Sequence, residues 1–202
     1  GAYIIILPDK KYYNTVSGEF GSLESTWSGN SLTFTNGKLY EEAAEANTIQ
    51  CSGVAWSDYF KAGDAVTIAG CTKHTENNKT PVIREINGDK MYFYENVFKL
   101  DGDNGTTEYT ETGNLTVRRT VPDLEYLCEN ENRLWSCDGR TIYASKLGDP
   151  FNWNVFEGLE TDSYAVDTGS AGDFTGCVSF LGYPVFFKED HIYKVYGSIP
   201  SN

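Results

Sequence analysis

The acidic stretch DGDNGTTE at 101–108 contains residue types that could hold a metal ion. Its carboxylates are Asp101, Asp103 and Glu108, and calcium prefers such hard oxygen ligands. A helix-flanked calcium loop would need Asp or Asn at position 105 and Gly at position 106, where this chain has Gly105 and Thr106. We therefore predict a polar hairpin turn here and no metal site.

Residues that could catalyse a reaction are scattered along the chain. His191 lies beside Glu189 and Asp190 in KEDHIY, but a catalytic triad also needs a nucleophile that this motif lacks, so we expect a solvated turn histidine. No pair of carboxylates is singled out for glycoside hydrolysis. Exposed tryptophans could stack on sugars, but we expect Trp27, Trp56 and Trp153 to lie in the core. Together these observations predict no catalytic residue and no cofactor.

The five cysteines are widely spaced and odd in number: Cys51, Cys71, Cys128, Cys137 and Cys177. There is no CxxC motif, and the two histidines, His74 and His191, lie far apart, which argues against a zinc site. We expect mostly buried, reduced thiols, as in proteins that fold in a cytoplasm. A Cys128–Cys137 bridge across a hairpin remains an alternative.

The composition indicates an acidic, strand-rich protein. The 202 residues include 29 acidic and 16 basic side chains, for a formal net charge of −13. Such a chain lacks the basic face that binding to phosphates requires. Fourteen Tyr and eleven Phe against one Met favour strands over a helical bundle. The longest apolar runs, AYIIIL and YPVFF, are of strand length and too short to span a membrane.

Three stretches share one pattern, an apolar run, a polar turn with Asp and a second run that ends on Tyr. They are IIILPDKKYY (4–13), LWSCDGRTIY (134–143) and PVFFKEDHIY (184–193). The second and third tyrosines are 193 − 143 = 50 positions apart, close to the period of a four-stranded propeller blade. The first and second are 143 − 13 = 130 apart, which leaves 130 − 50 = 80 residues for an inserted domain.

One repeat unit is expected to contain four short strands, at 124–129, 133–138, 141–146 and 163–167. SLTF (31–34) is expected to match SYAV (163–166) in the first unit. The hairpin pairs either Trp135 with Ile142 or, one residue shifted, by its tyrosines, and in both registers its two faces are apolar. A sheet buried on both faces must lie between neighbours, as propeller blades do. An ordinary β-sandwich is the alternative.

These observations predict an all-β fold: a fragment of a β-propeller, with about two to three four-stranded blade-like units, interrupted by a small β-barrel. The first propeller-like unit is expected at 1–40, the inserted SH3-like or OB-like barrel at 41–120, and the second and third units at 121–202. Because a closed propeller needs roughly four to eight blades, we expect a piece of a longer protein. The barrel's aromatic run Tyr92, Phe93 and Tyr94 is expected to pack in strands rather than bind nucleic acid.

The motif R-L-apolar … I/V-Y-x-S-x-x-G-D-P stands out in the second unit. Its residues here are Arg133, Leu134, Ile142, Tyr143, Ser145, Gly148, Asp149 and Pro150. With DFTGCVSFLGYPVFFKEDHIYKVYG after it, the chain resembles propeller-bearing structural proteins from the tail or head-to-tail neck of tailed bacteriophages and prophages. The resemblance covers 121–202 and 1–40 and fades in the inserted segment.

The resemblance implies a virion component that is assembled in the bacterial cytoplasm and has no catalytic residues. Its implied partners are other virion proteins and copies of itself in a ring around the DNA path, with passive rather than specific contact to DNA. Two other hypotheses stay open. One is a host-surface or glycan-binding module of the tail, and the other is a propeller glycosidase with two converging carboxylates.

Overall fold

The computed structural model describes residues 2–36, 47–94, 98–101 and 108–197 and confirms the all-β class. The chain divides into two compact units, Gly1–Glu24 with Thr120–Asn202, and Ser25–Arg119. The inserted unit therefore begins at Ser25, earlier than the residue 41 expected from the sequence. Short 3-10 turns at Trp56–Asp58 (η1) and Thr75–Asn77 (η2) are the helical elements of the described ranges. None of the described helices has the length and apolar character needed to cross a membrane.

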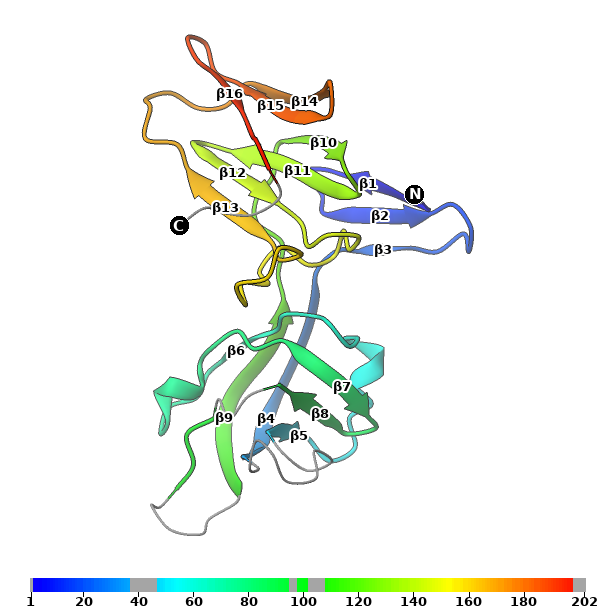
Figure 1. The fold of residues 1–202 in the computed structure, drawn as a ribbon. Coiled ribbons are helices and arrows are strands. Elements are labelled where there is room, and N and C mark those ends of the chain that lie inside the picture. Colours follow the sequence, from blue (N-terminus) through cyan, green and yellow to red (C-terminus); the bar gives the residue numbers. More distant parts are fainter. Residues whose placement is uncertain (1, 37–46, 95–97, 102–107, 198–202) are drawn as a thin grey trace. The chain divides into compact units, whose positions relative to one another are not determined.

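The first unit consists of three antiparallel sheets, each a simple meander (Figure 1). The first sheet contains β1 (Tyr3–Ile6), β2 (Lys11–Asn14) and β3 (Phe20–Ser22). The middle sheet contains β10 (Tyr126–Asn130), β11 (Arg133–Asp138), β12 (Thr141–Ala144) and β13 (Tyr164–Asp167). The third sheet contains β14 (Gly176–Phe180), β15 (Tyr183–Phe187) and β16 (Ile192–Lys194). The four strands expected between 124 and 167 match the middle sheet.

The middle and third sheets repeat one hydrogen-bonding register at a spacing of 50 residues. Every cross-strand pair of the third sheet has a counterpart 50 positions earlier; for example, Phe186 pairs with Tyr193 as Ser136 pairs with Tyr143. The turn before the central strand repeats too: both residues have positive φ at 131–132 (52° and 60°) and at 181–182 (50° and 79°). Two-residue turns with this geometry suit the twist of paired strands.

The hairpins pair by their tyrosines, which settles the register. Ile142 lies opposite Cys137 and not opposite Trp135, so the first of the two registers considered is wrong. In the first sheet Tyr13 pairs with Ile4, so all three hairpins place tyrosine at an equivalent position. The first sheet thus corresponds to β11–β13, and the third to β10–β12.

The SLTF run does not belong to the first propeller-like unit, so that expectation is wrong. Leu32 and Phe34 lie in β4 of the second unit, where both are fully buried. The fourth-strand position of the first sheet is taken by β3, in which Phe20 pairs with Tyr13 as Ala165 pairs with Tyr143.

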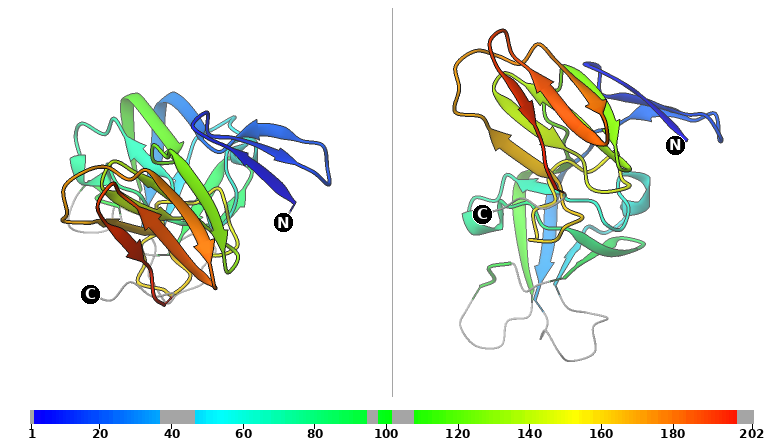
Figure 2. Two further views of the ribbon diagram at one scale, coloured as in Figure 1. Left: turned by 90° about the horizontal axis from the view of Figure 1, so that it is seen from above. Right: turned by 45° about the horizontal axis from the view of Figure 1, so that its top comes forward.

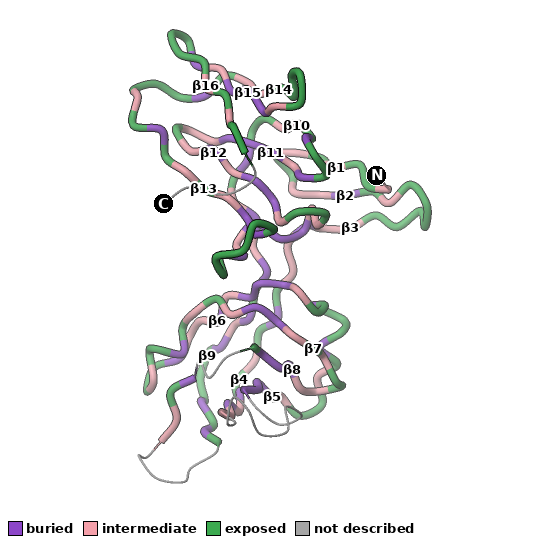
Figure 3. Tube along the Cα trace, viewed as in Figure 1, coloured by how far each residue is buried: buried purple, intermediate pink, exposed green. Residues whose placement is uncertain are grey.

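The middle sheet is buried on both faces, as its apolar pattern predicts (Figure 3). On one face, Leu127, Leu134 and Tyr143 pack against a cluster that includes Tyr12 of the first sheet. On the other face, Trp135 and its neighbours pack against Phe186 of the third sheet. The views in Figure 2 agree with the contacts of β14 with β10 and β11, which place the third sheet over the middle one.

The second unit contains one six-stranded antiparallel sheet of order β6-β9-β4-β5-β8-β7. Its strands are β4 (Ser25–Thr35), β5 (Thr48–Gln50), β6 (Thr67–Ala69), β7 (Ile83–Asn87), β8 (Lys90–Phe93) and β9 (Glu108–Arg119). The long β4–β9 pair shifts register between Gly29 and Ser31, and a Cβ at Gly29 would lie 2.2 Å from the Trp27 ring. A single core fills the unit, with Trp56, Phe34 and Phe93 among its largest side chains.

Backbone hydrogen bonds also join the two ends of this sheet. Val66 N–H donates to the Pro81 carbonyl and Ile68 N–H to the Lys79 carbonyl, at 3.0 and 2.8 Å. These bonds lie outside the regular ladder of β6 and β7, and the sheet is open as its strands are defined.

Candidate interaction surfaces

The first sheet has one apolar face without a neighbouring sheet among the described residues. Because side chains alternate along a strand, Ile5 and Tyr12 point into the core while the residues beside them point away. The face directed away carries Ile4, Ile6, Tyr13 and Phe20, which are between 39% and 64% exposed. We call these four residues the N-terminal outer face.

The third sheet has a corresponding apolar face on its far side. Phe186 and Tyr193 pack inward against the middle sheet. The opposite face carries Val178, Phe180 and Ile192, which are between 43% and 71% exposed. We call these three residues the C-terminal outer face.

The repeat shows what such a face does when a neighbour covers it. Ile142 and Ile192 occupy the same register position, 50 residues apart. Ile142 is 2% exposed because the third sheet covers it, whereas Ile192 is 71% exposed. The same residue type at the same position is therefore a core residue in one sheet and a surface residue in the next.

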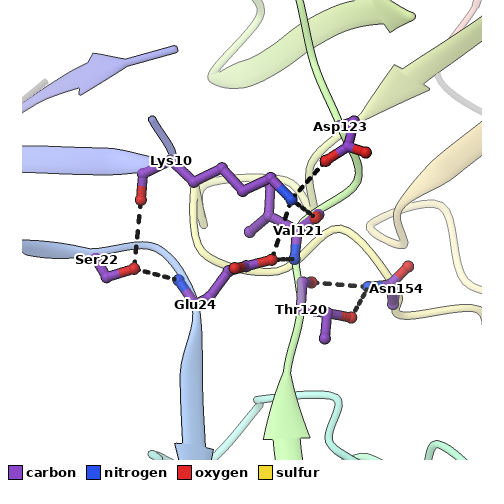
Figure 4. A network of polar contacts seen from close by, with 7 residues as sticks. All are labelled: Lys10, Ser22, Glu24, Thr120, Val121, Asp123 and Asn154. Atoms are coloured by element: carbon purple, nitrogen blue, oxygen red, sulfur yellow. Dashed lines mark hydrogen bonds and ion pairs between the residues drawn. The ribbon is translucent and has the colours of Figure 1, made fainter. Parts of the chain in front are cut away.

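A polar network fixes the two places where the chain crosses between its units (Figure 4). Lys10 Nζ donates to the Val121 carbonyl at 2.8 Å and to Glu24 Oε1 at 3.2 Å, and it pairs with Asp123 at 2.8 Å. The Val121 N–H donates to the same Glu24 oxygen at 3.1 Å. Burial lowers the pKa of Lys10, but hydrogen bonds to Asp123 and Glu24 outweigh this effect, so the pKa is raised above 10.5.

We expect Lys10→Met to destabilise the first unit by about 1–3 kcal/mol, because hydrogen bonds from a charged donor contribute about that much. The hydrogen bond with Lys10 lowers the pKa of Asp123 below 3.8. The stabilisation is therefore present above the ordinary Asp pKa and below the ordinary Lys pKa of 10.5, and it is lost outside this window.

Urea unfolding of both proteins at several pH values would measure this difference. Lys11→Met, on the neighbouring position of the hairpin, is the matched control. An equal loss in both variants, or a loss that does not change at pH extremes, would contradict the role given to Lys10.

The predicted metal candidates do not converge. Asp101 accepts from Lys73 at 2.5 Å and pairs with His74 at 2.7 Å, and these two bonds lower its pKa. Glu108 is exposed at the start of β9, and Asp103 lies outside the described residues. Within the described part of the chain, no group of three or more His, Cys, Asp or Glu could hold a metal ion.

The other candidate residues are in ordinary structural surroundings. His191 pairs with Asp190 at 2.6 Å on an exposed turn. Beside that turn, Asp173, Glu189 and Asp190 line an open hollow of about 400 Å³. The tryptophans Trp27, Trp56 and Trp153 are buried, as expected.

The expectations for the second unit's aromatic run and for the cysteines are met in part. Tyr92 and Phe93 are buried in β8, whereas Tyr94 is 55% exposed. All five cysteines are free; Cys71 and Cys137 are buried and the other three are half-buried. The Cys128 thiol hydrogen-bonds Cys177 rather than bridging to Cys137, and this bond and burial raise its pKa.

The residues of the two outer faces and Lys10 were not identified as candidates from the sequence. For the outer faces a signal was present, because the tyrosine-matched register assigns each residue to a face. Comparison of the chain with protein-family models, with curated proteins and with solved structures finds no match.

Proposed function

We propose that this chain is a non-enzymatic structural component of a tailed-phage virion, from the tail or the head-to-tail connector, and that it acts by assembly. The observation that carries this proposal is the repeated sheet with an uncovered apolar face at each end. Contiguous exposed apolar surface marks sites of protein–protein contact. The residue pattern of 133–150 adds the resemblance to phage structural proteins.

We infer that the three stacked sheets are blades of a β-propeller and that the second unit is a small barrel inserted between them. The 50-residue period and the middle sheet's double-sided burial support the blades. The backbone bonds between 66–68 and 79–81 support closure of the second unit into a barrel.

The net charge of −13 fits a component near a DNA path. DNA must pass a virion channel without sticking to it, and acidic side chains repel phosphates within a screening distance of roughly 8 Å. Of the basic residues in the second unit, Arg119 is buried against Asp64 and Lys73 is paired with Asp101. These contacts leave fewer cations to hold a phosphate backbone.

The glycan-binding alternative would need exposed aromatic side chains in a cleft. The burial of Trp27, Trp56, Trp135 and Trp153 weighs against it, since tryptophan is the side chain best suited to stack on a sugar. A glycan array probed with the whole protein tests this alternative directly. A reproducible hit that is lost on substitution of exposed Tyr94 would favour it over assembly.

The virion proposal is tested by locating the protein. An antibody against the purified chain should label the neck or tail of phage particles released by the strain that carries the gene. Deletion of the gene should give particles that lack tails or lose their DNA. Particles of normal form and infectivity that contain none of the protein would refute the proposal.

A further inference from the structure

The N-terminal outer face is equivalent to faces that pack against a preceding sheet elsewhere in the chain. Tyr13, Tyr143 and Tyr193 occupy the same register position. Tyr143 contacts the cluster shared with the first sheet, and Tyr193 contacts the cluster shared with the middle sheet. In each case the tyrosine side faces the sheet that comes earlier in the chain, and only Tyr13 has no such sheet among the described residues.

The C-terminal outer face is the complementary half of that contact. The register equivalents of Ile192 and Val178 are Ile142 and Cys128, which pack against the following sheet. The chain therefore ends in a following face on one side and a preceding face on the other. The contact between the middle and third sheets shows that these two kinds of face fit together.

We propose that a second copy of this chain docks head to tail, with its C-terminal outer face against the N-terminal outer face of the first. This inference rests on the proposed assembly role and specifies its surfaces. One chain carries both halves of the contact, so the contact is heterologous and can close into a ring. Two copies with three sheets each supply six, within the roughly four to eight sheets of closed propellers.

Both faces are mainly apolar, and each has one lysine, Lys11 or Lys194, in its strands. Lys194 Nζ lies 3.7 Å from the centre of the Tyr183 ring, so its stem and charge are held along the sheet. Docking would bury Ile4, Phe20, Phe180 and Ile192. A carboxylate placed among them would be desolvated on docking, which is unfavourable unless it finds a partner.

Sedimentation velocity over a range of protein concentrations tests the proposal with two variants, Ile4→Asp and Ile192→Asp. The wild-type chain should dimerise, and each variant alone should dimerise at least about tenfold more weakly, because each has lost one half of the contact. An equimolar mixture of the variants should regain association, since each supplies the intact face that the other lacks. Val16→Asp changes an exposed apolar residue in a turn and should associate like the wild type.

The outcomes separate this inference from the proposed function. A wild-type chain that stays monomeric, an Ile4→Asp or Ile192→Asp variant that dimerises normally, or a mixture without recovery would overturn head-to-tail docking. Association in one variant alone would instead indicate a symmetric contact through its intact face. Absence of the protein from phage particles would refute the virion role and leave a measured docking contact standing.

Discussion

Phe186→Ala should lower the free energy of unfolding of the first unit by about 3–5 kcal/mol, the usual cost of removing a buried phenylalanine side chain. Phe186 is fully buried between the middle and third sheets, with ring centres of Phe174 and Trp135 at 5.8 and 6.4 Å. The substitution leaves a cavity in the contact that unites the two repeats. Since a domain is stable by only about 5–15 kcal/mol, this loss is a large part of the total.

Hydrogen exchange measured by mass spectrometry assigns the effect to a unit. Peptides from 120–197 should lose protection in Phe186→Ala, while peptides from 47–94 should keep it, because the two units are separately compact. Phe180→Ala on the exposed face of the same sheet is the matched control and should change stability by about 0.5 kcal/mol or less. Equal losses for Phe180 and Phe186 would mean that the repeat contact does not hold the sheets together.

The sequence predicted the repeat well because register depends on local features. The alternation of apolar residues and the two-residue turns at 131–132 and 181–182 fix which residues pair, so the distance between Tyr143 and Tyr193 reports a real structural period. The same logic predicted that both faces of the middle sheet are buried.

Pairing partners far apart in sequence were not predictable in the same way. Leu32 and Phe34 alternate as in any half-buried strand, and nothing in SLTF shows that its partner is β9 rather than a blade strand. The true fourth strand of the first sheet, Phe20–Ser22, is short and contains glycine, so it has little strand signal. The boundary of the inserted unit was misplaced for this reason.

The candidate site shows the same division. Lys10 contacts Val121 across 111 positions of sequence, and its role follows only from the fold that brings the two chain crossings together. The outer faces depend on the register, which was known to within one residue, and on which sheets have neighbours. Exposure of Ile192 cannot be inferred from its type, since Ile142 at the same position is buried.

Asp64→Ala should destabilise the second unit by about 3–5 kcal/mol, because it breaks a buried ion pair by removing one partner. Asp64 is fully buried, and its Oδ2 accepts from Arg119 Nη1 at 2.5 Å and from the Lys61 N–H at 3.0 Å. Without the carboxylate, the buried Arg119 guanidinium lacks this counter-charge, and desolvation of a cation is unfavourable.

The double variant Asp64→Leu/Arg119→Met distinguishes loss of the pair from loss of a charge partner. Replacing both members by apolar side chains removes the buried charges together, so the double variant should be more stable than Asp64→Ala. Asp101→Asn, at an exposed ion pair of the same unit, should leave unfolding unchanged. Urea unfolding read by the exchange of peptides from 47–94 measures all three. A double variant no more stable than Asp64→Ala would show that the pair's hydrogen bonds to the backbone, rather than the compensation of charge, hold this end of the sheet.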